Sequence, residues 1–268
     1  VYRQGTTFVY SDGTWETDKY IHSTNGDFLI NENYVRLEGL QRELVGNTIV
    51  ITGFSQQDFV LDSGASDIRI SHSYIKGTAP STGAMAGIYL GGATPAKLTV
   101  WNTIITDIQG DSIQINNDSE VYVYNSLIYN SLNRGIAEYA SPNLTVTNTV
   151  VFSTRAGSSY DFEGTMTISY CASDEALGTN AVDLASSTGM WANTFYDYQN
   201  GDFCLKSQLS QLYEAGTTLG WVSDDMTGLA RPYGAAYDIG PFEFIYRPKH
   251  ELQPGDGYIQ FHGHVQFE

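Results

Sequence analysis

A short pattern of alternating apolar and polar residues returns along the middle of the chain at nearly constant spacing. It occupies residues 98–105, 121–128 and 144–151, and an asparagine is the fifth residue of each copy. Successive asparagines are 23, 23 and 45 residues apart, and a tyrosine divides the last interval. An earlier copy, 30 residues upstream at 68–73, has a histidine in the asparagine place. The positions of this column are His72, Asn102, Asn125, Asn148, Tyr170 and Asn193.

Each copy is followed by a second alternating apolar pair among Gly, Ser and Asn residues. The pairs are Ile88/Leu90, Ile113/Ile115, Tyr160/Phe162, Val182/Leu184 and Phe203/Leu205. A period of two residues predicts short strands with one buried face. Two or three such strands per repeat are typical of a solenoid whose coils stack in parallel. Stacking superimposes equivalent positions, so we expect apolar columns inside the solenoid and a ladder of asparagine side chains within a turn.

Over roughly residues 30–245 the chain resembles the right-handed parallel β-helix proteins of the pectate-lyase-like class, whose turns often carry such an asparagine ladder. The resemblance implies an all-β fold, a right-handed parallel β-helix (solenoid) with an N-terminal cap and a C-terminal extension. We expect the cap and first coil in residues 1–33, the β-helix in residues 34–246 and a tail strand in residues 247–268. Unrelated functions share this scaffold, so the resemblance transfers no catalytic residue.

Residues 202–243, here called the closing segment, resemble the end of many bacterial and phage β-helix proteins. The segment runs from Asp202-Phe203-Cys204-Leu205 through Gly228-Leu229-Ala230-Arg231-Pro232 to Asp238-Ile239-Gly240-Pro241-Phe242-Glu243. In that family an apolar strand leads through a Gly-bearing turn and an Arg-Pro to an Asp-Ile-Gly strand that ends in Phe-Glu. We expect Arg231 to pair with Asp238 or Glu243 and to fix the last coil.

The tail after residue 246 has strand alternation around Tyr258–Phe267 and lies outside the coil repeat. An extra strand needs an edge to pair with. The tail either lies back on its own chain as a lid on the final coil or pairs with a neighbouring chain. Short β-helices with an extra terminal strand resemble phage surface proteins that trimerise, so the resemblance implies a homotrimer.

The charge of the chain narrows the choice of partners. Thirty acidic against 13 basic residues give a formal net charge of −17. Such a surface repels nucleic acid and anionic membranes, so neither is an expected partner. No apolar run reaches 18 residues, so no membrane span is expected. The chain begins at Val1 without a methionine, which is compatible with a removed leader and with an extracellular or virion-surface location.

The two cysteines are expected to remain unpaired. Cys171 follows the asparagine column, whereas Cys204 lies between the inward residues Phe203 and Leu205 and is expected to point outward. Residues in different columns of different coils do not meet the geometry of a disulfide bond.

An aromatic cluster is expected on the outer face of the first strand of the repeat. Trp101 and Tyr124 occupy equivalent positions on adjacent coils, and Tyr122 lies two residues before Tyr124. Flat aromatic faces beside hydroxyl groups suit sugar rings and equally suit the side chains of a protein partner. The alternative is that these residues are ordinary strand formers on a solvated face. Trp101, Tyr122 and Tyr124 are therefore candidates for binding a glycan or another surface protein.

An acidic cluster is expected on the second strand. The alignment places Asp161 over Asp183 with Glu163 beside them, and like charges at such spacing need a cation or a raised pKa. The three residues are therefore a candidate Ca²⁺ site. Glu138 falls where other coils have inward apolar residues, so either Arg134 pairs with it or the register slips and Tyr139 turns inward.

An enzyme would need a constellation that the sequence does not assemble. Lyases on this fold use a basic residue beside a neutralised uronate, but Lys97, Arg134 and Arg155 fall on different coils. Two carboxylates in a glycosidase lie about 5–9.5 Å apart, a spacing that the pairs Asp161/Asp183 and Asp107/Asp111 can meet without matching a family motif. His262 and His264 share a strand face, and the two imidazoles are a candidate metal pair that lacks a third ligand.

The sequence therefore predicts a non-enzymatic structural or adhesion protein, which is a decoration or binding module at the cell exterior or on a virion surface. The alternative is a polysaccharide lyase or glycoside hydrolase that acts on a glycan.

Overall fold

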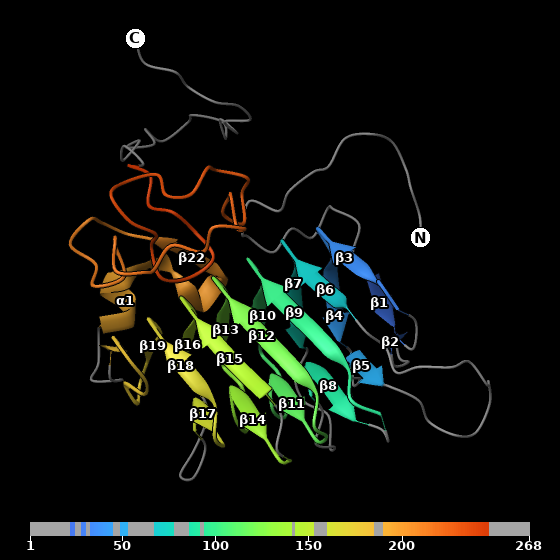
Figure 1. The fold of residues 1–268 in the computed structure, drawn as a ribbon. Helices are drawn as coiled ribbons and strands as arrows, with labels where there is room; N and C mark the ends of the chain where they lie inside the picture. Colours follow the sequence, from blue (N-terminus) through green and yellow to red (C-terminus); the bar gives the residue numbers. More distant parts are fainter. Residues whose placement is uncertain are drawn as a thin grey trace.

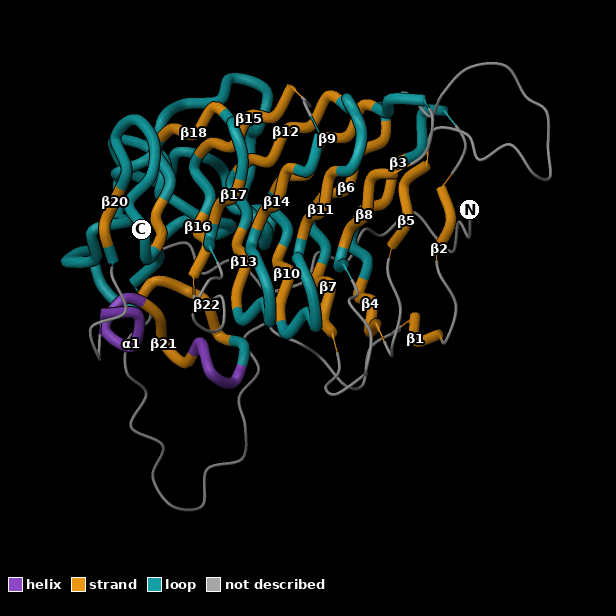
Figure 2. Tube along the Cα trace, turned by 90° about the horizontal axis from the view of Figure 1, so that it is seen from below, coloured by secondary structure: helices purple, strands orange, loops and turns teal. Residues whose placement is uncertain are grey.

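The computed structural model describes residues 22–24, 28–30, 33–44, 49–52, 67–77, 86–91, 94–140, 143–152, 160–184 and 190–246. These residues form a parallel β-helix with three sheets, here called A, B and C (Figures 1 and 2). The cap and first coil were predicted in residues 1–33, of which only 22–24, 28–30 and 33 are described, and the predicted tail in residues 247–268 lies outside the described residues.

Sheets B and C have six strands each, and their neighbouring strands are parallel. Along sheet C these are β3 (Arg36–Glu38), β6 (Ile68–Ser71), β9 (Lys97–Trp101), β12 (Glu120–Tyr124), β15 (Asn143–Thr147) and β18 (Thr167–Ser169). Along sheet B they are β2 (Phe28–Ile30), β5 (Ile49–Thr52), β8 (Ile88–Gly91), β11 (Ile113–Ile115), β14 (Ile136–Glu138) and β17 (Phe162–Glu163).

Sheet A has eight parallel strands, and from residue 36 to residue 163 its strand follows a strand of C and precedes a strand of B in each coil. They are β1 (His22–Thr24), β4 (Gln41–Leu44), β7 (Tyr74–Gly77), β10 (Ile104–Thr106), β13 (Leu127–Tyr129), β16 (Val150–Phe152), β19 (Ala172–Ser173) and β20 (Val182–Asp183). The chain continues through α1 (Met190–Thr194), β21 (Phe195–Asp197), a 3-10 helix (Tyr198–Asn200) and β22 (Asp202–Leu205), which pairs antiparallel with β21.

The 23-residue repeat corresponds to one coil of the solenoid. Val121 pairs with Leu98 on one side and with Leu144 on the other, so equivalent apolar residues stack in a column. All three are 0–2% exposed, as the alternation predicts. The prediction of an all-β, right-handed parallel β-helix is confirmed.

The asparagine column marks one sharp bend between sheets C and A. His72, Asn102, Asn125, Asn148 and Tyr170 all have positive φ, between 43° and 52°. Asparagine tolerates this left-handed conformation better than most residues, which explains why it recurs there. The predicted ladder of mutual asparagine bonds is not found among these residues. Asn102 Nδ2 lies 3.2 Å from His72 Nε2, whereas the other side-chain hydrogen bonds of Asn102 and Asn148 reach the closing segment.

The alignment of the last repeats was wrong. Val182 pairs with Ala172 in sheet A rather than extending sheet B, and Phe203 lies in the antiparallel pair of β21 and β22. Asn193 lies in α1 rather than in the turn column. The parallel β-helix therefore ends before residue 190. The chain after this point packs against the side of the β-helix.

The final part of the chain covers the outer face of sheet A. Phe152 of β16 stacks on Trp191 of α1 at 4.0 Å between ring centroids, and Phe195 and Phe203 join the same buried cluster. Because this cover buries both faces of β22, Cys204 is only 7% exposed and the prediction that it points outward was wrong. Neither cysteine forms a disulfide bond, as predicted.

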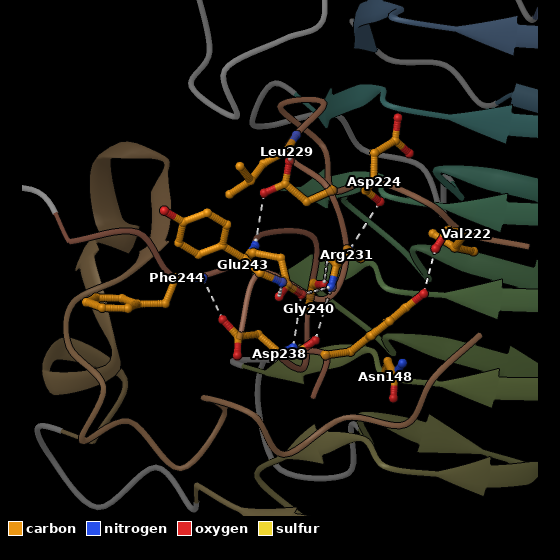
Figure 3. Close-up of polar contacts among 12 residues, drawn as sticks. Asn148, Val222, Asp224, Leu229, Arg231, Asp238, Gly240, Glu243 and Phe244 are labelled. Atoms are coloured by element: carbon orange, nitrogen blue, oxygen red, sulfur yellow. Dashed lines mark hydrogen bonds and ion pairs between the residues drawn. The ribbon is translucent and has the colours of Figure 1, made fainter. Parts of the chain in front are cut away.

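The closing segment is fastened by a buried arginine (Figure 3). Arg231 forms an ion pair with Glu243 at 2.6 Å, and their side chains are 0% and 1% exposed. The same guanidinium donates to the backbone carbonyl oxygens of Asp224, Asp238 and Gly240. The expected pairing of Arg231 with Glu243 is confirmed, whereas Asp238 accepts through its carbonyl oxygen and not through its carboxylate.

Candidate binding groove

The predicted aromatic cluster lies on sheet C as expected. Tyr124 pairs with Trp101 and Tyr122 pairs with Thr99 in the parallel register of β12 and β9. The rings of Tyr122 and Tyr124 stack at 5.9 Å between centroids with an angle of 18°. The strand alternation points these side chains away from the core, so they form a continuous aromatic surface on the outer face.

A third element, absent from the sequence-based prediction, completes the cluster. Trp221 of the closing segment packs edge-on against Trp101 at 5.5 Å and against Tyr124 at 5.3 Å. Its side chain is still 52% exposed. Trp221 lies about 100 residues from β12 in a region without strand periodicity, so no local pattern could place it on sheet C.

Tyr122, Tyr124 and Trp221 line an open groove with a volume of about 350 Å³. Tyr122 and Thr99 lie along the strands, Tyr124 and Trp221 provide further aromatic surface, and Trp101 supports Trp221 without lining the groove. The remaining lining residues are Asp67, Arg69 and Lys97. The groove therefore combines three aromatic rings with one acidic and two basic side chains.

One end of the groove carries an arginine pair around a single carboxylate. Asp67 accepts from Arg69 Nε at 2.8 Å and from Arg36 Nη2 at 2.5 Å. The hydrogen bonds from Arg69 and then from Arg36 hold the pKa of Asp67 below its usual value. Two guanidinium groups share one carboxylate, so these three side chains together carry one net positive charge.

A second charged pair borders Tyr122. Lys97 Nζ lies 3.1 Å from Glu120 Oε1 and 5.4 Å from the centroid of the Tyr122 ring. The Tyr122 hydroxyl also donates to Glu120, and these bonds from Tyr122 and then from Lys97 lower the pKa of that carboxyl. Burial raises the pKa of Tyr124 to about 12, so its hydroxyl remains protonated at neutral pH.

The structure does not bring the three predicted calcium ligands together. Glu163 lies at the end of sheet B and pairs with Arg134, whereas Asp183 pairs with Ser173 in sheet A. Asp161 is 1% exposed and accepts from the backbone amide of Asp174 at 2.7 Å. The expectation that Asp161 lies over Asp183 was wrong, because β20 extends sheet A. Within the described ranges no group of three or more His, Cys, Asp or Glu residues could hold a metal ion.

The register slip expected near Glu138 does not occur. Glu138 pairs with Ile115 in register, and its carboxylate accepts from the Thr165 amide at 2.8 Å. Tyr139 stays half exposed and donates its hydroxyl to Asp111, while Arg134 donates to that hydroxyl. Glu138 is thus satisfied by a neighbouring backbone amide, a partner that the sequence alone does not indicate.

Comparison with known families agrees with the fold. Residues 36–196 match the family described as the right handed beta helix region, which is more than half of the 268 residues. The chain belongs to this family. Comparisons with curated proteins and with solved structures give no match. No helix within the described ranges is long and apolar enough to cross a membrane.

Proposed function

We propose that the groove on sheet C binds a carbohydrate and that the protein is a non-enzymatic binding module, located outside the cell or on a virion surface. The observation that carries this proposal is the meeting of Tyr122, Tyr124 and Trp221 beside charged groups. The ring planes of Trp221 and Tyr124 are inclined at 74° to each other, so the flat faces of the two rings point in different directions. The apolar faces of a sugar ring fit against such surfaces, while its hydroxyl groups reach the polar rim.

The charges of the groove favour an acidic saccharide. Arg69 and Lys97 line it with Asp67, and the adjoining Arg36 and Glu120 bring the count to three basic against two acidic side chains, although the whole chain has a net charge of −17. A guanidinium group binds carboxylate or sulfate with two parallel hydrogen bonds, and an ammonium group adds a point charge. An acidic saccharide also meets less repulsion here than elsewhere on the surface.

A lyase or hydrolase is the second candidate, because the groove joins Arg69 and Lys97, two basic groups from adjacent coils. Each of them already donates to a carboxylate. A glycosidase needs one carboxyl group that stays protonated near neutral pH. Asp67 and Glu120 have lowered pKa values, which does not suit that role. These contacts favour binding over catalysis.

A saccharide screen distinguishes the two candidates. The protein is titrated with neutral oligosaccharides of glucose and N-acetylglucosamine and with acidic oligogalacturonate, oligoalginate and sulfated heparin fragments. Binding to an acidic member without turnover supports the proposal. A product that absorbs in the ultraviolet identifies a lyase, and new reducing ends identify a hydrolase. If no member binds or reacts, a glycan-binding function is contradicted.

We also propose that the protein is a homotrimer assembled through the C-terminal tail. This rests on the alternation in residues 247–268, which lie outside the described residues, and on the resemblance to trimeric surface proteins. Light scattering is expected to give three times the chain mass for the full chain and the monomer mass after truncation at Tyr246. A monomer in both cases excludes the trimer and favours a tail that lies on its own chain.

A further inference from the structure

We infer that the asparagine column positions Trp221, so that buried side chains at the bend between sheets C and A define one wall of the groove. The inference builds on the groove of the proposed function, but its test needs no ligand. It concerns the stretch 217–224 of the closing segment, which contains Trp221 and crosses the bend between sheets C and A.

One end of this stretch is attached to Asn102. The Asn102 side chain is fully buried, and its Nδ2 donates to the backbone carbonyl oxygen of Asp224 at 2.9 Å. His72, one coil earlier, places Nε2 at 3.4 Å from Oδ1 of the same Asp224. Arg231 Nε donates to the Asp224 carbonyl at 3.2 Å, which connects this attachment to the buried arginine (Figure 3).

The other end is attached to Asn148, two coils further along. Asn148 Nδ2 donates to the carbonyl oxygen of Thr217 at 2.7 Å, and the Thr217 amide donates to Asn148 Oδ1 at 2.8 Å. The side-chain amide of Asn148 thus donates one hydrogen bond to Thr217 and accepts one from it, as the backbone of a neighbouring strand would. The Gly240 amide, also in the closing segment, donates to the Asn148 carbonyl at 2.8 Å.

Asn125 lies between these two attachments and makes neither of them. It has the same left-handed conformation, with φ of 43°, and is also fully buried. Its Oδ1 and Nδ2 have no hydrogen-bond partner within the described part of the chain. The column therefore contains two asparagines that hold the stretch and one at an equivalent position that does not.

The asparagine column is adjacent in sequence to the aromatic cluster. Trp101 and Tyr124, which contact Trp221, are the residues immediately before Asn102 and Asn125. Because Thr217 and Asp224 are fixed, only the few residues on either side of Trp221 can change the position of its side chain. The Tyr237 hydroxyl restricts it further, because its single proton is shared between the carbonyl oxygens of Val222 at 2.7 Å and Leu219 at 3.1 Å. Asn102 and Asn148 are thus positioning residues for the groove.

The test compares Asn102→Gly and Asn148→Gly with the matched control Asn125→Gly. Glycine adopts positive φ without strain, so each variant removes a buried amide from the same backbone conformation. Hydrogen exchange of a peptide covering 217–226 and the quenching of Trp221 fluorescence by acrylamide report the attachment. The Trp221 signal is obtained as the difference from the Trp221→Phe protein.

We expect exchange to be about five- to tenfold faster in each of the first two variants and unchanged in Asn125→Gly, because a lost hydrogen bond lowers the local opening free energy. Quenching of Trp221 should rise in parallel. Equal behaviour of all three variants, or native exchange in the first two, overturns the inference. If Asn102→Gly does not fold, Asn148→Gly tests the other attachment. A saccharide that binds the native protein while exchange is equal in all variants leaves the proposed function standing and removes only the positioning role.

Discussion

Arg231→Ala is expected to lower the free energy of unfolding by about 3–5 kcal/mol, because it leaves buried charges without their partner. Asp225, Asp238 and Glu243 are each no more than 5% exposed and surround the guanidinium. The same substitution removes the hydrogen bonds to the Asp224, Asp238 and Gly240 carbonyl oxygens. The loss should appear as a lower midpoint of urea unfolding.

The matched control for this variant is Arg36→Ala. Arg36 is also paired with a carboxylate, but its side chain is 42% exposed and its partner Asp67 is 25% exposed. Exposed pairs contribute about 0–1 kcal/mol, so the midpoint should change little. If Arg231→Ala and Arg36→Ala have equal effects, the buried arginine does not fasten the closing segment.

The second large effect is a dependence of stability on pH. Burial raises the pKa of Asp238 from 3.8 to about 6, and the neighbouring Glu243 carboxylate adds to the rise. Burial also raises the pKa of Glu243 itself. A group with a raised folded-state pKa contributes stability that is complete below its unfolded pKa and is lost as pH rises through its folded pKa. We therefore expect the protein to gain about 2–3 kcal/mol between pH 7 and pH 4.

This gain has an acid limit. Asp67 and Glu120 have lowered pKa values, so their contributions are lost as the pH falls further. Thermal unfolding across pH 3–8 should give a maximum near pH 4–5, and the slope between pH 4 and 6 should be smaller in Asp238→Asn, whatever its absolute stability. A melting temperature that falls steadily from pH 7 to pH 4 contradicts the assignment of Asp238.

The sequence predicted the parts of the structure that repeat. Spacing of 23 residues determined which residues stack, and the neighbours Trp101 and Tyr124 followed from it. The same reasoning predicted wrong positions for Val182 and Phe203, where the repeat ends but apolar alternation continues. Alternation reports a buried face without reporting which sheet buries it.

Contacts between distant parts of the chain were the main features that the sequence did not predict. Trp221 joins Trp101 only because the closing segment crosses the turn column, which no local period encodes. The asparagines recur because of a left-handed bend, and the amides of Asn102 and Asn148 bond to the closing segment instead of to each other. The repeat indicated the position of these residues, but not their partners.

The most direct test of the binding groove is calorimetric titration with the tightest saccharide of the screen. Trp221→Ala and Tyr122→Ala each remove a lining ring, and Tyr160→Ala removes a tyrosine that is 48% exposed and does not line the groove. We expect the dissociation constant to rise about ten- to thirtyfold in the first two variants, because large aromatic side chains dominate such contacts, and to stay unchanged in the third. Equal affinity of all four proteins contradicts the assignment of the groove as the binding site.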